Sequence, residues 1–542
     1  MLSTLRALPQ VRVVQRLVSL ILPAAIEAHG PSTTIQCLPN ELLTQIAEYL
    51  VDKQDHSTFA KRDLGALCRT TRLLRTAATP LFYYSVSCEG SPCRLAKIVR
   101  TLLECPRLAM HIRYVAVRLH REVVRVSTSS TSGASIANAI LPSGNQDPWA
   151  GRRLLFALTT GLHDGNAVLL LILAKHVETL DLVLPGDDDT LLQETPVPSL
   201  YDFASFMANL VSWANYPDTE YPHDANRQSI VENRPLTKVH TVCLRPYWEL
   251  SAQSQGDVPL PIPDHYMNLP SITSMTSHGS ALRKPQVVSD YIAWSSITKL
   301  HLYEACICTT ELARLVQSCY KLVDLEVEWD FSLRHGNRGH EIHPMDFSEL
   351  SSALAGHTKS LTHLRLLVND AWLDPSPNGT LHSLAKFNAL ETLELDECCI
   401  FASGLYIDLD EDYGQDPIEK QPDVLPSSLR EFMMFTRQTM SMVYTTLLFV
   451  EHMMPASLRS LKLSFSDALP YDVEFLEPKL GDFLNIIPQA SMTHGAKLRS
   501  VNGQEAVLTL HSDEGVCAVL SEIHRLPLLR DTVEKLKAAN LI

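Results

Sequence analysis

Three histidines in one short segment are the first residues whose type and spacing could support chemistry. His335, His340 and His343 lie close together, and imidazole nitrogen is a common zinc ligand. The segment also contains Gly336 and Gly339 and has no neighbouring cysteine. We therefore favour a loop over a metal site, with a metal-dependent enzyme built on these histidines as the alternative.

A second set of residues has the spacing of calcium ligands. Its carboxylates occupy positions 1, 3, 5, 9 and 12 of a calcium-binding loop: Asp408, Asp410, Asp412, Asp416 and Glu419. The glycine of such loops belongs at position 6, whereas Gly414 stands at position 7, and Pro417 interrupts the run. This pattern favours a solvated acidic insertion. A separate acidic run, residues 187–189, is expected to form a solvated turn.

Sequence motifs of the common enzyme classes are missing. There is no Gly-x-Gly-x-x-Gly, no phosphate-binding loop ending in Lys-Ser/Thr, no Gly-x-Ser-x-Gly and no His-Glu-x-x-His. We predict that the chain is not an enzyme and has no catalytic residues, no cofactor and no bound metal.

The twelve cysteines are scattered, and several adjoin apolar runs. The close pairs lack the second pair that a zinc site would need. These pairs are Cys88 and Cys93, Cys306 and Cys308, and Cys398 and Cys399. Reduced thiols in a cytoplasmic or nuclear protein are the expectation.

Charge is distributed unevenly along the 542 residues, whose net charge is −15. Residues 1–126 hold 17 Lys+Arg against 9 Asp+Glu, and the remainder holds 29 against 52. An acidic body without a basic stripe argues against binding to nucleic acid. Its acidic faces favour solubility, with attraction of a basic partner as the alternative. No apolar run reaches the roughly 18–20 residues that span a bilayer, so we expect no membrane partner.

The first 36 residues carry Arg6, Arg12 and Arg16 and no acidic residue before Glu27. This composition is typical of a mitochondrial-type presequence. An amphipathic or disordered extension without a targeting role is the interpretation that we favour.

Residues 37–87 have the pattern of a small helical unit. The run Leu38-Pro39-Asn40-Glu41 places a proline near the first turn of a helix, where its missing N–H costs nothing. A polar loop separates this helix from a second periodic segment, which we expect Pro80 to end. The apolar positions are Leu42, Leu43, Ile46, Tyr49 and Leu50, then Leu64, Leu67, Cys68, Thr71, Leu74 and Ala78.

The rest of the chain carries an internal repeat, apolar-x-x-apolar-x-apolar. From the fourth copy onward the starts are 25, 39, 29, 39 and 29 residues apart, as in strand-plus-helix repeats with insertions. The copies are Ile112/Val115/Val117, Val177/Leu180/Leu182, Val239/Val242/Leu244, Ile297/Leu300/Leu302, Leu322/Leu325/Val327, Leu361/Leu364/Leu366, Leu390/Leu393/Leu395, Leu429/Phe432/Met434 and Leu458/Leu461/Leu463.

The last two apolar positions of each copy share one face of a strand, so stacked copies bury a continuous core. We expect helices between strands at 311–319, 347–355 and 381–387. Two copies add a residue that we expect to be buried at the following turn, Asn369 and Cys398.

These patterns divide the chain into six parts. They are an N-terminal extension (1–36), the helical unit (37–87), a connecting helix and first strand (88–125), a flexible loop (126–150), the repeat body (151–520) and a C-terminal helix (521–542). Insertions are expected near 185–235, 246–290 and 403–425, where proline and polar or acidic residues accumulate.

The helical unit resembles the F-box, a module of about 50 residues. The matching residues are Leu38-Pro39, Glu41-Leu42-Leu43, Ile46, Leu50, Asp63-Leu64, Leu67, Cys68-Arg69, Leu74 and Leu81-Phe82-Tyr83. The loop between Leu50 and Leu64 is longer than in the family pattern. An F-box followed by a degenerate leucine-rich-repeat-like body is similar to the layout of many fungal F-box proteins. The resemblance implies an α/β fold in which a short helical module precedes a strand/helix solenoid.

The resemblance also implies a function. An F-box protein is the substrate-recognition adaptor of a Skp–cullin–F-box (SCF) ubiquitin ligase: it docks on the Skp-type adaptor, reaches cullin through it, and holds a target protein. By position, the adaptor-binding residues would be Leu38, Pro39, Leu42, Leu43, Ile46 and Leu50. One alternative is that these residues pack against the first repeat. Another is a leucine-rich scaffold that works outside a ubiquitin ligase. The sequence does not identify the target.

Overall fold

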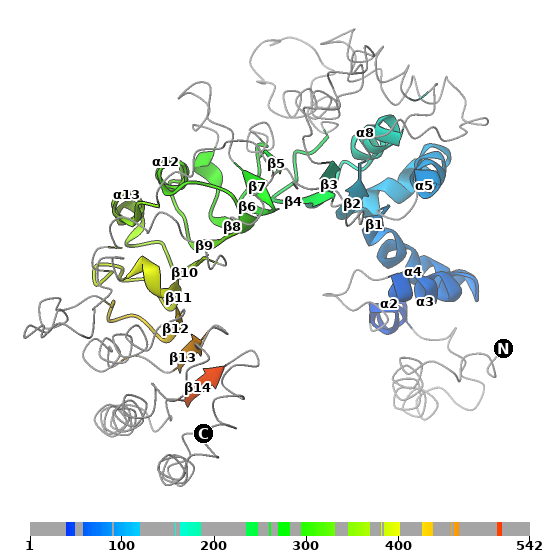
Figure 1. Cartoon of the computed structure of the whole chain (residues 1–542). Coiled ribbons are helices and arrows are strands. Elements are labelled where there is room, and N and C mark those ends of the chain that lie inside the picture. Colours follow the sequence, from blue (N-terminus) through cyan, green and yellow to red (C-terminus); the bar gives the residue numbers. More distant parts are fainter. Residues whose placement is uncertain are drawn as a thin grey trace, which may run out of the picture. The chain divides into compact units, whose positions relative to one another are not determined.

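The computed structural model describes several segments of the chain, and all structural statements refer to them. They are residues 39–48, 58–88, 92–119, 158, 163–185, 235–247, 260–261, 269–281, 294–330, 345–368, 381, 384–400, 425–436, 457, 460–465 and 507–511. The elements fall into two compact units, α2 to β4 and β5 to β14, and each unit is treated by itself (Figure 1).

The first unit begins with three helices, α2 (Asn40–Glu48), α3 (Thr58–Cys68) and α4 (Arg72–Tyr84). The second periodic segment of the sequence is therefore two helices instead of one. Thr71 accounts for the break, because its extended backbone starts α4 and its hydroxyl accepts a hydrogen bond from Leu74 N at 3.2 Å. A side-chain oxygen at this position satisfies an N–H that the first helical turn leaves unpaired.

The three helices enclose apolar clusters of their own. One cluster joins α2 to α4 and the other includes α3, and the periodic positions of the sequence supply both. Their buried members are Leu43, Ile46, Leu74 and Ala77 in the first, and Ala47, Leu64 and Ala78 in the second. Leu43 and Ile46 thus pack against α4, a neighbour within the same helical unit.

Pro80 does not end the helix, contrary to the expectation from sequence. α4 continues through it to Tyr84. A proline inside a helix removes the hydrogen bond to the carbonyl four residues earlier, here that of Thr76. Leu81 and Phe82 lie beyond the proline and pack against the second cluster. Both side chains are partly buried, and their packing opposes the cost of the lost hydrogen bond.

The rest of the first unit is built of parallel strands and further helices. The helices are α5 (Pro92–Glu104), the 3-10 helix η3 (Pro106–His111) and α8 (His163–Leu173), and α5 packs against α8. The strands are β1 (Ser85–Ser87), β2 (Tyr114–Arg118), β3 (Thr179–Pro185) and β4 (Thr241–Tyr247). Each strand pairs in parallel with the next, and apolar partners align: Val86 with Val115, Val115 with Leu180, and Leu180 with Val242.

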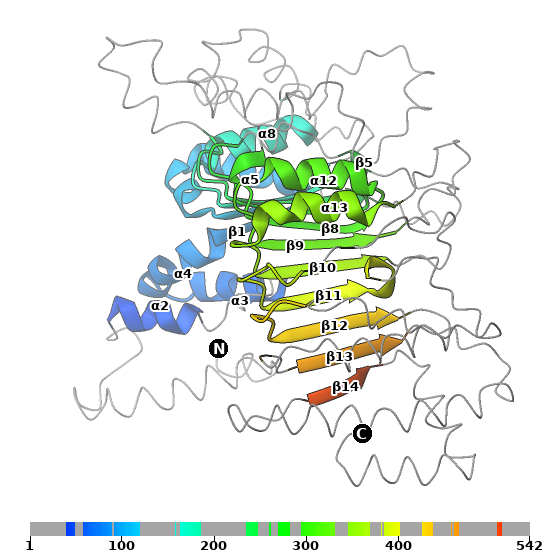
Figure 2. The same cartoon turned by 90° about the vertical axis from the view of Figure 1, so that its left-hand side faces the viewer.

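The second unit continues the same scheme, with each long strand paired in parallel to the next (Figure 2). The strands are β6 (Ser274–His278), β8 (Lys299–Ala305), β9 (Asp324–Trp329), β10 (His363–Val368), β11 (Thr392–Asp396), β12 (Glu431–Thr436), β13 (Ser460–Phe465) and β14 (Val507–His511). Two short strands, β5 (Leu260–Pro261) and β7 (Ser280–Ala281), pair with each other. Leu300, Leu325, Leu364, Leu393, Phe432, Leu461 and Leu508 stand in one row across β8 to β14.

The repeat pattern predicted these strands because its apolar positions form the core. The last two positions of every copy lie on a strand. In the first eight copies all three side chains are at most 1 % exposed. Fully burying a Leu, Ile or Val contributes roughly 1.5–3 kcal/mol, so each copy supplies a substantial part of the stability.

Two of the three helices expected between strands are present, and the third prediction is wrong. α12 (Thr309–Ser318) and α13 (Phe347–Leu354), which the 3-10 helix η7 (Ala355–His357) extends, pack against each other on one side of β8 to β10 (Figure 1). The described residues of 381–387 form turns instead, although Leu381, Leu384 and Phe387 are buried. The segment is too short to gain much from helix propagation. None of the described helices has the length and apolarity that a membrane span requires.

The repeat pattern did not predict β6 and β14, because one position of the pattern differs in each of these strands. β6 lies within 246–290, which was expected to be an insertion, and its last inward position is Ser277, a polar residue that is 1 % exposed. β14 aligns Leu508 and Leu510 with β13, but the sequence has Glu505 at the first position of that copy.

Candidate functional site

The six residues with a predicted role in adaptor binding have different environments. Leu38 and Leu50 lie outside the described residues. Pro39 is exposed and Leu42 is half-buried on the first turn of α2. Leu43 and Ile46 are 0 % and 3 % exposed, within the apolar cluster shared with α4. The surface of the helical unit therefore presents Pro39 and part of Leu42.

The sequence-based candidates for metal binding cannot be placed. The histidines of 335–343, the carboxylates of 408–419 and the acidic run 187–189 all lie outside the described residues, as does Asn369. Cys398 is described and is half-buried, which corrects the expectation that it would be buried. Its neighbour Cys399 is the fully buried thiol, and its Sγ lies 3.9 Å from Leu366 O.

A cluster of charged side chains on β8, β9 and β10 is the principal polar site of the second unit. The residues alternate along each strand with the buried leucines, so they share the opposite face of the sheet. Parallel register places His301 beside Glu326 and Glu326 beside Arg365, with Asp324 beside His363 in the neighbouring row.

Glu326 lies at the centre of this cluster, and its two carboxylate oxygens have different neighbours. Oε2 accepts a hydrogen bond from the Tyr303 hydroxyl at 2.5 Å and lies 3.7 Å from Arg365 Nη1. Oε1 lies 3.7 Å from His301 Nε2 and 3.5 Å from His363 Nε2. One oxygen is thus held by the tyrosine and the arginine, and the other faces two imidazoles.

Arg365 extends the cluster to a further strand. Its Nη2 lies 3.7 Å from Glu328 Oε2, and its Nε lies 3.5 Å from Glu394 Oε2 on β11. The guanidinium therefore pairs with carboxylates from both neighbouring strands. Cross-strand pairs of opposite charge each contribute roughly 0.2–1 kcal/mol, so this network favours the observed strand order.

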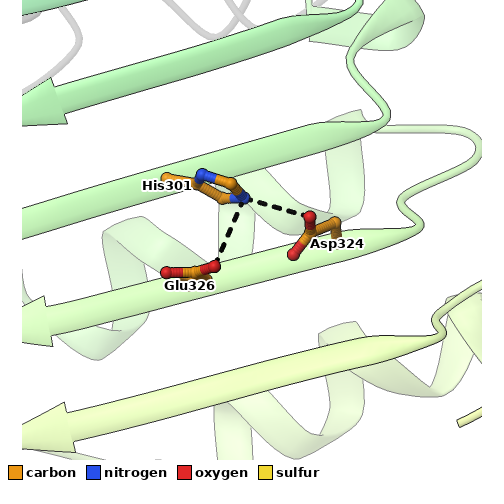
Figure 3. Close-up of side chains that lie close together, drawn as sticks. All are labelled: His301, Asp324 and Glu326. Atoms are coloured by element: carbon orange, nitrogen blue, oxygen red, sulfur yellow. Dashed lines mark ion pairs between the residues drawn. The ribbon is translucent and has the colours of Figure 1, made fainter. Parts of the chain in front are cut away.

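His301 and Asp324 form the closest contact between an imidazole and a carboxylate in the cluster. His301 Nε2 lies 3.2 Å from Asp324 Oδ2, and both side chains are about four-fifths buried. Figure 3 shows the two side chains and Glu326 pointing toward one another from β8 and β9. One ligand atom from each of these three residues lies within 4.8 Å of the other two, close enough to bind a single metal ion.

The proton affinities follow from this arrangement. The interaction with His363 is the largest cause that lowers the pKa of Glu326 to about 2, and the Tyr303 hydrogen bond acts in the same direction. Glu326 in turn raises the pKa of His363. Burial is the main cause that raises the pKa of Tyr303, followed by the hydrogen bond to Glu326. Glu326 is therefore ionised at neutral pH and Tyr303 remains a hydrogen-bond donor.

The first unit has a smaller polar site of the same kind. Asp181 on β3 is 7 % exposed and accepts hydrogen bonds from Arg245 Nε at 3.0 Å, from Arg245 Nη2 at 2.8 Å and from the Tyr114 hydroxyl at 2.6 Å. Three neighbouring strands contribute these groups. Burial, then the hydrogen bond to Asp181, raises the pKa of Tyr114.

The sequence contained a signal for the charged cluster. His301, Glu326 and Arg365 each occupy the variable position between the last two apolar residues of a copy. Equivalent positions of successive parallel strands are neighbours. That column, read across the copies, brings the three side chains together although they are far apart in the sequence.

Comparison with known proteins identifies a family for the repeats. No curated protein matches the chain. The leucine-rich repeat domain family matches residues 93–442, which include α5 and the strands from β2 to β12 and exclude the three-helix unit. The matched range is well over half of the chain, and the buried copies of the repeat lie within it. This chain belongs to the leucine-rich repeat domain family.

Proposed function

We propose that this chain is a protein-interaction scaffold and the substrate-recognition adaptor of an SCF-type ubiquitin ligase. The helical unit would dock on a Skp-type adaptor and reach cullin through it. The repeats, stacked as a solenoid, would hold a target protein on their strand face. Modification of the target would be carried out by the other subunits, and this chain would contribute proximity without an active site of its own. We place it in the cytoplasm or nucleus.

One observation carries this proposal: a three-helix unit that resembles the F-box directly precedes the leucine-rich repeats in the chain. Such a layout joins a docking module to a recognition surface. The charged cluster supports the second role, because partly buried ion pairs hold polar side chains in fixed positions on the strand face. Fixed polar groups favour specific recognition of one partner over another.

The burial of Leu43 and Ile46 sharpens the docking half of the proposal. Both residues stabilise the helical unit, so the accessible apolar contact would come from Pro39 and Leu42. Substitution of Leu43 or Ile46 would destabilise the unit and would not test docking. Leu42 also packs against the first cluster, but it is only half-buried, so it is the better position for a test.

The experiment compares Leu42→Asp with Gln45→Asp. Gln45 is exposed on the same helix, so the second variant adds the same charge away from the proposed contact. We expect the full-length wild type and Gln45→Asp to co-purify with a Skp-type adaptor, and Leu42→Asp to lose at least about tenfold in affinity. Circular dichroism of all three proteins verifies that the helices are retained. Failure of the wild type to bind the adaptor, or equal binding by Leu42→Asp, contradicts the proposal.

A scaffold that works outside a ubiquitin ligase is the second candidate, because the family match covers the repeats and excludes the helical unit. Quantitative mass spectrometry of affinity-purified complexes separates the two. The ligase adaptor predicts cullin in the wild-type complex and its loss in Leu42→Asp. The scaffold predicts a complex without cullin in either case.

Target binding has its own variant. Lys299 and Glu431 are exposed at the start of β8 and β12, on the strand face. The double charge reversal Lys299→Glu/Glu431→Lys is expected to lose the target and keep the adaptor, the opposite of Leu42→Asp. If both variants keep every co-purifying protein, the strand face is not the recognition surface.

A further inference from the structure

We propose that His301, Asp324 and Glu326, with His363 beside them, form a binding site for a divalent transition metal ion of the zinc class. The site lies on β8, β9 and β10 of the second unit. It differs from the sequence-based metal candidates, which come from other segments. The proposal is independent of the ubiquitin-ligase function, since it concerns only the chemistry of these side chains.

The donor types fit such an ion. The imidazole nitrogen of His301 and the carboxylates of Asp324 and Glu326 are ligands that zinc accepts, and zinc sites with three protein ligands keep a fourth position for water. Mg²⁺ and Ca²⁺ prefer sites made of oxygen alone, so the imidazoles argue against both.

The distances between donors fit as well. Zinc bonds of roughly 2.0–2.2 Å place tetrahedral ligand atoms about 3.3–3.6 Å from one another. His301 Nε2 lies 3.2 Å from Asp324 Oδ2 and 3.7 Å from Glu326 Oε1, and His363 Nε2 lies 3.5 Å from Glu326 Oε1. Charge-assisted hydrogen bonds are shorter, about 2.7–2.9 Å. The donor atoms of His301, Asp324 and Glu326 are thus spaced as ligands around a shared ion.

Unsatisfied atoms in the cluster give independent support. His301 Nε2, Asp324 Oδ1 and His363 Nε2 are buried and make no hydrogen bond within the described part of the chain. The two imidazole nitrogens have only carboxylate neighbours, at 3.2–3.7 Å, and a buried polar atom that makes no hydrogen bond is costly. A metal ion bound by His301, Asp324 and Glu326 would remove much of that cost.

The surroundings would orient the ligands. The Tyr303 hydroxyl and Arg365 hold Glu326 through Oε2, which leaves Oε1 for the ion. Such outer contacts usually fix the orientation of ligating side chains. Asp324, Glu326, Glu328 and Glu394 outnumber the nearby Arg365, so the local charge favours a cation.

In the test, the full-length protein is treated with a chelator and then titrated with zinc. Calorimetry measures the affinity, and metal analysis measures the number of ions bound per chain. We expect one zinc ion per chain with micromolar or tighter affinity. His301→Gln and Asp324→Asn are each expected to weaken binding by at least about 100-fold, and Tyr303→Phe by about 10- to 100-fold. Cobalt(II) in place of zinc should give the visible absorption of a tetrahedral site, without the strong near-ultraviolet bands of thiolate ligands.

Two controls locate the site. His240→Gln removes an exposed histidine that lies 3.9 Å from Glu178 in the first unit, and it should bind zinc like the wild type. So should the triple variant His335→Gln/His340→Gln/His343→Gln. The proposal is overturned if the wild type binds no zinc, if His301→Gln and Asp324→Asn bind it normally, or if the triple variant abolishes binding. Asp324→Asn preserves side-chain shape, and its far-ultraviolet circular dichroism separates loss of the site from loss of the fold.

Discussion

At the scale of single residues, buried polar groups in this chain are held by neighbours that come from other repeats. Asp181 bonds to side chains on both adjacent strands, and Glu326 does the same through its two oxygens. His357 is the counterpart on the helical side. It is 3 % exposed, and its Nε2 lies 3.0 Å from Val316 O on α12. At these places neighbouring repeats are held together by polar groups as well as by the core.

His357 makes stability depend on pH. Burial lowers its pKa below the usual value of 6.5, and its Nδ1 is buried without a hydrogen-bond partner. Below about pH 6.5, His357 therefore binds a proton in the unfolded chain more readily than in the folded chain. The free energy of unfolding is therefore highest above pH 6.5, where His357 is neutral in both states. It falls as the pH drops toward the lowered pKa, by at most about 1.4 kcal/mol per pH unit.

Chemical denaturation between pH 7.5 and pH 5 tests this prediction. His357→Gln should flatten the pH dependence of the unfolding free energy, because glutamine does not titrate. Equal slopes for wild type and His357→Gln would contradict the assignment.

At the scale of elements, the ends of the helices decide how the chain is divided. Thr71 separates α3 from α4, and Asp346 starts α13 by accepting a hydrogen bond from Ser348 N at 2.9 Å. The Ser348 contacts lower the pKa of Asp346. Both are small polar residues that precede an apolar helix, as helix N-termini prefer.

We predict that Thr71→Ala destabilises the helical unit by about 1 kcal/mol, because Leu74 N loses its acceptor. Thr71→Ser keeps the hydroxyl and should cost only a few tenths of that amount. Urea denaturation followed by far-ultraviolet circular dichroism measures the difference. A loss as large in the serine variant would mean that the β-branched side chain matters more than the cap.

Most of the fold could be predicted from the sequence, because one physical pattern dominates it. The copies of the repeat predicted β2 to β4 and β8 to β13, and the alternation of apolar positions predicted their faces. β6 was missed because Ser277 is buried at a position that is apolar elsewhere, and α4 was cut at Pro80 because the packing of Leu81 and Phe82 is not visible in a local pattern. The charged cluster was missed because its strands are far apart in the chain, with 25 residues from His301 to Glu326 and 39 from Glu326 to Arg365, and proximity depends on strand register.

At the scale of the whole molecule, each repeat contacts its sequential neighbours. Stability in such arrays is approximately a sum of local repeat terms and nearest-neighbour interfaces. A defect in one repeat should therefore spread to the adjacent repeats and fade beyond them.

Leu364→Ala tests this expectation. Leu364 is fully buried on β10, and its truncation should cost about 2–5 kcal/mol. Hydrogen–deuterium exchange should rise in β9, β10 and β11 and remain unchanged in β2 and β3. Tyr320→Ala, at a side chain that is 79 % exposed, should leave the exchange of all these strands unaltered. Uniformly faster exchange throughout the chain would show that it unfolds as one cooperative body.

The in-register pairing of the parallel strands also constrains how the sequence can change length. Successive copies start 25, 39 or 29 residues apart, yet their leucines stay in one row, because all the variation falls between strands. One residue added within a strand would turn its leucines to the opposite face, whereas a dozen added between strands leave every pair intact. Natural variants of this chain should therefore gain and lose residues freely in the connections and almost never inside β8 to β13. The same rule marks the connections as the places where a tag or a second domain can be inserted.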